Sequence, residues 1–357
     1  MFRFSEESHA VRAESVGTDV TRSALASLRL AIKAYFETYY VCNKNNIILP
    51  ASPSDPSDPF HEYEMDQIEA LCNKLDYQEK YMQCIFHFHH FFELFLKDLL
   101  KTKHPYLALK LSLDSRNAEL ILNIINNRVT PEHVIHDNTV EFGLALDRVH
   151  SLRSNDSVAN IIAQYKGTLE DLNLLRNRAW HRGLLILRID ALDTFISKNV
   201  FPLLLKLMET SNYKGKERYW KYNQADLDPI EKIVEHSTEN YKALLFFKAY
   251  GNACYNLPSK FNLDLHDTLS KAKAIVDSIP NLELHECLVC KESTLLVSTE
   301  HDVDTDTEGR PVAAWWNTTA AECLNCRFTI YPDVGEPTEY GVGSQLLWET
   351  GSHSFDD

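Results

Sequence analysis

Apolar side chains recur at helical spacing over most of the first 280 residues. From Thr21 to Val41, apolar residues return every three or four positions, a pattern that predicts an amphipathic helix. Four prolines then fall within residues 50–59. Because each proline removes a backbone donor and fixes φ, we expect a linker or long loop there, and a domain boundary.

The helical pattern continues beyond the prolines. Residues 61–101 predict one or two long helices, and within them the stretch 81–100 is polar on only about half of the helix surface. Further helical patterns cover residues 116–127, 140–152, 158–165, 169–188 and 191–208. Together these segments predict a helical bundle over residues 60–212.

The pattern stays helical to residue 283 and then changes. In residues 213–283, the clearest helical pieces are 230–250 and 269–278. After Cys287, short apolar runs alternate with turn signals, which is typical of a small β-rich module. We therefore expect a mainly α protein with four parts: an N-terminal helix and Pro-rich linker (1–59), a helical domain (60–212), a helical extension (213–283) and a β-rich module (284–357).

Composition excludes several classes of protein. The 357 residues carry a net charge of −15, so the chain is not suited to coat duplex DNA through its general field, and nucleic-acid contact would need a local basic site. The chain lacks an apolar run of about 18 residues and an apolar signal region at its start, so we expect a cytoplasmic protein without a membrane partner. No glycine-rich phosphate loop appears, which argues against P-loop, dinucleotide-binding and kinase chemistry.

The clearest spacing signal is a pair of CxxC motifs, formed by Cys287 with Cys290 and by Cys323 with Cys326. Four thiolates fill the tetrahedral shell of Zn²⁺ and leave no position for a water, so the predicted zinc is structural. The segment resembles a zinc ribbon. The alternative is four unliganded thiols. The other four cysteines stand among apolar residues and, without a signal peptide, do not indicate a disulfide framework.

A local basic segment interrupts the acidic chain at Arg176-Asn177-Arg178-Ala179-Trp180-His181. Metal-free RNA cleavage needs a histidine that exchanges protons near neutral pH and a guanidinium that holds the charged phosphorane. Asn177 and His181 are four residues apart and share a helix face, so the amide can orient the imidazole. Arg176 and His181 are about 140° apart. Three arrangements would complete the site: Arg176 reaches around the helix, the helix starts near Arg176, or a second copy of the chain supplies the missing residue.

This segment resembles the ribonuclease motif of the HEPN superfamily, in which an Arg is followed by a polar residue and then by a His. Leu172–Asn177 and the upstream Phe92–Lys97 segment also look like the family, and the resemblance covers residues 60–212. It implies an all-α bundle and metal-independent cleavage of RNA that leaves a 2′,3′-cyclic phosphate. It also implies a homodimeric site with Arg176, Asn177 and His181 as catalytic residues, and Glu93 paired with Arg176 or positioning it.

The resemblance implies a biological setting as well. Many family members are toxins or antiviral effectors that stay inactive until triggered, so we expect a regulatory partner or trigger. A non-catalytic HEPN-like module that only grips a nucleotide or RNA, or that serves dimerisation, is the alternative. A transferase would need a nucleotide-binding motif that the sequence lacks.

Several motifs also have ordinary structural interpretations. The arginines around His181 also suit a solvated basic face, and Glu93 also suits an ion pair with Lys97 one turn away. The cations and aromatics of residues 213–222 suit single-stranded nucleic acid, but a solvated loop with a buried tryptophan is favoured. Residues 302–308 resemble an EF-hand start without its glycine and final glutamate, and we expect an acidic loop.

Overall fold

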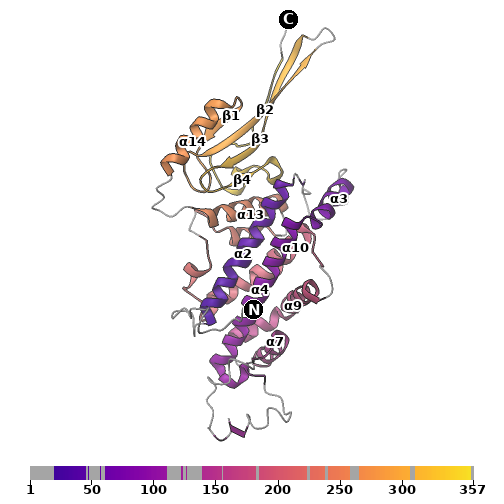
Figure 1. Cartoon of the computed structure of the whole chain (residues 1–357), viewed down its shortest axis with the longest axis vertical. Coiled ribbons are helices and arrows are strands. Elements are labelled where there is room, and N and C mark those ends of the chain that lie inside the picture. Colours follow the sequence, from indigo (N-terminus) through magenta and orange to yellow (C-terminus); the bar gives the residue numbers. More distant parts are fainter. Residues whose placement is uncertain are drawn as a thin grey trace, which may run out of the picture. The chain divides into compact units, whose positions relative to one another are not determined.

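The computed structural model describes residues 20–45, 47, 57, 61–110, 122–123, 126, 139–154, 156–181, 185–222, 226–237, 240–257, 265–305 and 310–354. The chain is mainly helical with a small antiparallel sheet at its C-terminal end, which confirms the predicted fold class (Figure 1). Most of the predicted helix 116–127 and most of the Pro-rich segment lie outside the described residues. No helix in the described ranges is long and apolar enough to span a membrane.

The chain forms two compact units, each assembled from three segments. The first unit contains residues 1–32, 82–186 and 202–221, and the second contains residues 33–81, 187–201 and 222–357. The four-part division into 1–59, 60–212, 213–283 and 284–357 stays a prediction.

The first unit is helical. It takes the first part of α2 (Val20–Lys44) and most of α4 (Leu75–Lys103), and it continues with η1 (Pro105–Ala108), α7 (Phe142–Ser151), α8 (Ser157–Gln164), α9 (Lys166–His181) and α11 (Phe201–Thr210). The predicted helix 169–188 thus ends at residue 181. Asp156 caps α8 by accepting a hydrogen bond from the Ala159 amide at 2.8 Å.

Aromatic side chains of α4 form much of the core of this unit. Phe91 and Phe95 contact Tyr213, with ring centroids 6.3 and 4.8 Å away. Tyr213 and Trp220, which flank η3 (Glu217–Tyr219), are buried, as is Tyr222 in the second unit. These three packed rings are not open to stack on bases, whereas Tyr219 of the same segment is 36% exposed. The burial of Trp220 matches the favoured interpretation, a loop with a buried tryptophan.

The second unit contains one helix that is almost entirely buried, α13 (Tyr241–Asn256). Besides the last part of α2 and the start of α4, its other helices are α3 (His61–Cys72), α10 (Ile189–Phe195), the π-helical turn η2 (Ile196–Val200), α12 (Pro229–His236) and α14 (Leu265–Ser278). Residues 241–254 of α13 are buried except Lys242, as expected of a helix with apolar residues on most of its circumference. The predicted helix 230–250 is split, because Asn240 caps α13 by accepting from the Ala243 amide at 3.0 Å.

The sheet belongs to the second unit. Its strands are β1 (Leu282–His285), β2 (Leu295–Thr305), β3 (Pro311–Cys323), β4 (Thr329–Ile330) and β5 (Thr350–Ser354), in the order β1-β2-β3-β4 with β5 on β3. Short helical turns η4 (Pro332–Val334) and η5 (Pro337–Tyr340) follow β4. Phe328 and Tyr340 contact Phe246 of α13, with ring centroids 6.1 and 5.3 Å apart, so the module packs on the buried helix.

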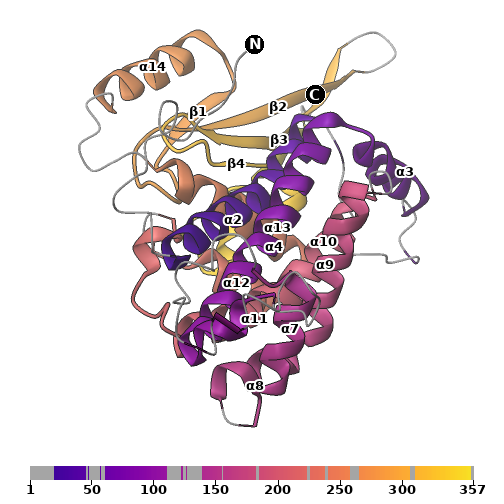
Figure 2. The ribbon, with the colours of Figure 1, turned by 60° about the horizontal axis from the view of Figure 1, so that its bottom comes forward.

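One prediction for this module was wrong. The sequence predicts an acidic loop over residues 302–308. Residues 302–305 instead extend β2 and pair with β3. Acids alternate with Val303 and Thr305, and alternation is a strand pattern. Beyond the end of β1, β2 and β3 continue as an extended ribbon (Figures 1 and 2).

Candidate functional site

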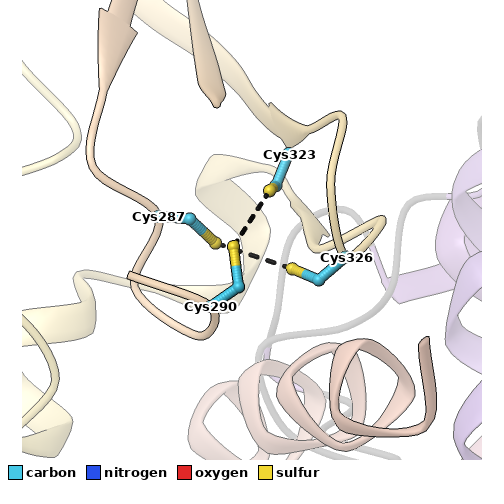
Figure 3. A group of neighbouring side chains, drawn as sticks. All are labelled: Cys287, Cys290, Cys323 and Cys326. Atoms are coloured by element: carbon cyan, nitrogen blue, oxygen red, sulfur yellow. Dashed lines mark hydrogen bonds between the residues drawn. The ribbon is translucent and has the colours of Figure 1, made fainter. Parts of the chain in front are cut away.

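Four cysteines converge in the C-terminal module. Cys287 and Cys290 come from the loop after β1, Cys323 ends β3, and Cys326 lies in the turn that follows it (Figure 3). All four Sγ atoms lie within 4.8 Å of one another, and among the described residues they are the group able to share a metal ion. The closest pairs, Cys287–Cys326 and Cys290–Cys323, are 3.6 Å apart. A tetrahedral metal with sulfur bonds of about 2.3 Å separates its ligands by about 3.8 Å, so the set could hold a metal ion.

The two CxxC turns have the same backbone design. The carbonyl of each first cysteine accepts from the residue four positions on, Lys291 at 3.0 Å and Arg327 at 2.9 Å. Each of these two residues has a left-handed φ, 61° and 60°. The amides of Cys287 and Cys323 donate to residues five positions on, at 2.8 and 2.7 Å. The repeat of all three features shows that the sequence builds two matching sulfur-presenting turns.

The four thiols share their protons unequally. Hydrogen bonds with the other thiols, above all Cys287, lower the pKa of Cys290, and a hydrogen bond with Cys287 lowers that of Cys323 to about 7, whereas the pKa values of Cys287 and Cys326 are raised. The Val289 amide donates to Cys287 Sγ at 3.4 Å, and Thr294 Oγ1 lies 3.2 Å from Cys323 Sγ. Donors aimed at sulfur support the ionised form that binds metals.

A second candidate site is a polar network between α4 and α9 in the first unit. Arg176 Nη1 donates to Asn177 Oδ1 at 2.8 Å, and Asn177 Nδ2 donates to Asn173 Oδ1 at 3.4 Å. On α4, His89 Nε2 lies 3.0 Å from the same Asn173 oxygen. Two of the predicted catalytic residues are thus joined to α4 through Asn173.

His89 is the buried centre of this network. An amide oxygen only accepts hydrogen bonds, so Nε2 of His89 carries the proton and Nδ1 is the bare nitrogen. Nδ1 lies 3.9 Å from Glu93 Oε2, and the imidazole stacks on Phe142 with centroids 4.4 Å apart. Burial lowers the pKa of His89, which favours the neutral ring.

The structure describes the side chains of three predicted catalytic residues, Arg176, Asn177 and Glu93, but not that of His181. Arg176 and Asn177 contact each other near the end of α9. His181 is the last residue of α9, four positions after Asn177, and its side chain lies outside the described part. Glu93 Oε1 accepts from Lys97 Nζ at 2.6 Å. Glu93 is linked to Arg176 indirectly, through the successive contacts of His89, Asn173 and Asn177.

Sequence reasoning missed His89 and Asn173. His89 of α4 bonds to Asn173 of α9, while the neighbouring His90 Nδ1 lies 2.7 Å from Ser27 Oγ of α2. Asn173 and Asn177 are one helical turn apart, a spacing visible in the sequence, but the partner on α4 could not be read from it.

Comparison with known proteins finds no family model, no curated protein and no solved structure that matches the chain. The HEPN resemblance therefore rests on the Arg176 motif and on its place at the end of a helix in a helical unit.

Proposed function

We propose that the chain is a metal-independent endoribonuclease of the HEPN type, which cleaves RNA and leaves 2′,3′-cyclic phosphate ends. The observation that carries the proposal is the contact of Arg176 with Asn177 on α9, cross-linked to α4 through Asn173 and His89. A helix end held by a network of this kind offers fixed polar groups to a substrate, which is what catalysis by positioning requires.

Arg176 would stabilise the phosphorane. A guanidinium has five N–H donors, so its one bond to Asn177 Oδ1 fixes its position while other donors can bind phosphate oxygens. Charge developing on those oxygens strengthens these hydrogen bonds in the transition state. Asn177 is accordingly a positioning residue for Arg176, besides its predicted role toward His181.

His181 would move the proton. Imidazole has an ordinary pKa of about 6.5, so it can take the 2′-hydroxyl proton or protonate the leaving 5′-oxygen near neutral pH. It follows Asn177 by one helical turn, and Arg176 by five residues. This offset supports the proposal that a homodimer completes the site, with one motif facing the other.

The cysteine cluster would hold structural zinc. Four sulfurs at tetrahedral spacing leave no open ligand position, so the metal would stabilise the module and take no part in cleavage. A cytoplasmic location, as proposed, would keep the four thiols reduced and able to bind the metal. By resemblance, the protein would act as a toxin or antiviral effector controlled by a regulatory partner or trigger.

The test is incubation of the full-length protein with single-stranded RNA in EDTA, followed by chemical analysis of the new RNA ends. We expect His181→Ala to reduce cleavage by about 10²–10⁴-fold and Arg176→Ala to reduce it severely. The matched control is Arg178→Ala, which removes an exposed arginine two residues away and should leave the rate near that of the parent.

Each other outcome has a clear meaning. Parental cleavage by His181→Ala would refute the mechanism. RNA binding without cleavage would establish the alternative, a non-catalytic nucleotide- or RNA-binding module. Loss of cleavage in EDTA while circular dichroism shows an intact fold would contradict metal independence. A fully active protein that sediments only as a monomer would refute the dimeric site.

A further inference from the structure

The acidity of the chain is concentrated at its C-terminal end. Residues 282–357 carry fifteen acidic and three basic side chains, while the preceding 281 residues carry 36 acidic and 33 basic ones. Most of the net charge of −15 therefore belongs to the β-rich module. A partner of this module has to tolerate or use a strong negative field.

Strand β2 has an open edge in this module. β1 pairs with β2 only as far as Ser298, and the Thr299 amide makes one more hydrogen bond, to the Asn281 carbonyl at 2.9 Å. Asn281 has a left-handed φ of 70°, which turns the chain away from β2. From Glu300 to Thr305, β2 pairs with β3 on one side, and no described strand pairs with its other side.

The direction of the backbone amides also indicates that this edge of β2 is open. Outward and inward N–H groups alternate along a strand, so the Val303 amide points to the same side as the Thr299 amide. Val303 N–H donates instead to the carboxylate of its neighbour Asp302, at 2.8 Å. The side chain thus substitutes for the missing strand. A new strand at this edge could take the amide and release the carboxylate.

The side chains of the ribbon combine charge and apolar surface. Glu300, Asp302 and Asp304 alternate along β2 and therefore share one face. Trp315 of β3 lies directly opposite Asp302 and is 45% exposed. Val303, which is 47% exposed, alternates with these acids and lies on the opposite face of the ribbon. Charged residues alone would protect an edge from aggregation, but the exposed Trp315 beside the carboxylates gives their face an apolar contact for a partner.

We propose that the 300–305 edge of β2 binds an extended peptide segment of a partner protein that has Arg or Lys at every second position. The peptide would add a strand to the sheet, with backbone hydrogen bonds to β2. Its alternate cationic side chains would lie beside Glu300, Asp302 and Asp304, and one would stack on Trp315. A second copy of this edge is not the occupant, because like carboxylates would then face each other.

The test uses the full-length protein and two synthetic nonapeptides of identical composition, measured by calorimetry at low salt. One peptide alternates Arg with Thr, and its isomer places all the Arg residues together. We expect the alternating peptide to bind more tightly, and Asp302→Asn with Asp304→Asn to weaken it by about 2- to 30-fold. Glu322→Gln, which removes an exposed acid at the other end of the sheet, is the matched control.

A backbone variant separates strand addition from charge attraction. Val303→Pro removes the outward amide at an edge position where proline is tolerated, so the fold should persist, as checked by circular dichroism, while peptide binding is lost. Equal affinity of the two isomers, equal weakening by Glu322→Gln, or unchanged binding by a folded Val303→Pro protein would overturn the proposal. So would absence of binding at about 1 mM peptide, the weak end of measurable affinity.

Discussion

Replacement of Lys248 by Met tests the most buried charge pair in the second unit. Lys248 Nζ of α13 lies 2.6 Å from Asp193 Oδ1 of α10, and neither side chain is exposed. Asp193 Oδ2 also accepts from the Tyr241 hydroxyl at 2.9 Å, and the ammonium lies 4.7 Å from the centre of the Tyr35 ring. Methionine keeps most of the length of the side chain but leaves the Asp193 carboxylate without its cation.

Loss of one partner of a buried pair lowers the free energy of unfolding by about 3–5 kcal/mol, because the remaining charge is uncompensated. With urea m-values of about 2–3 kcal/mol/M, the unfolding midpoint should fall by about 1–2 M in a urea titration followed by circular dichroism. Asp193→Asn in the Lys248→Met background removes that charge, so it should recover much of the loss.

The loss of stability caused by Lys248→Met should change with pH in a direction that the pKa of Asp193 determines. Burial raises the pKa of Asp193, and the Lys248 charge lowers it, so Lys248→Met raises it further. The folded state then binds a proton that the unfolded state releases, and stability increases as pH falls. The deficit of Lys248→Met relative to the parent should therefore shrink at lower pH. A deficit under about 0.5 kcal/mol, the size of a neutral surface change, or a deficit that grows on acidification would refute this reasoning.

Three further changes probe other parts of the molecule. On the proposal that the cluster holds zinc, Cys326→Ser should lower the zinc content found by elemental analysis and unfold the β-rich module, since zinc contributes about 10–16 kcal/mol in small zinc domains. Zinc retained at the parental content would contradict the site. Burial raises the pKa of Asp333 to about 6, so parental stability falls as pH rises from about 4 to 6; Asp333→Asn should raise Tm at pH 8 and leave it nearly unchanged at pH 4. A Cβ on Gly251 would lie 2.5 Å from the Phe36 ring, so Gly251→Ala should destabilise by about 1–3 kcal/mol in urea, whereas Gly143→Ala, where no atom lies within 4 Å, should not.

The helices could be predicted wherever one apolar face repeats. The patterns over 21–41 and 61–101 match α2, α3 and α4 closely. Boundaries failed where a polar side chain ends or starts a helix, as at Asn240, whose capping bond splits the predicted helix 230–250. The periodicity of apolar residues continues through such a cap, so it does not show the break.

The two candidate sites differ in what local sequence determines. The cysteine cluster could be predicted because each CxxC turn is local, and pairing of β2 with β3 brings the two turns together. The network around Arg176 could not be predicted beyond α9, because the contact of His89 with Asn173 joins residues 84 positions apart. Helical spacing indicates which residues share a face of α9, whereas the choice of α4 as the facing helix depends on packing.

The uneven distribution of charge changes what the net charge of −15 implies. If the net charge were spread evenly over the chain, it would repel nucleic acid. The charge is nearly balanced before residue 282, however, and residues 176–188 contain four arginines and no acid. Exposed charges are screened over about 8 Å in physiological salt, so a phosphate at the end of α9 would respond mainly to charges within that range, among them Arg176 and Arg178. The acidic module is instead suited to a basic peptide. RNA and a cationic partner would therefore be selected by different segments, which allows the partner to act as a regulator without competing for phosphate-binding residues.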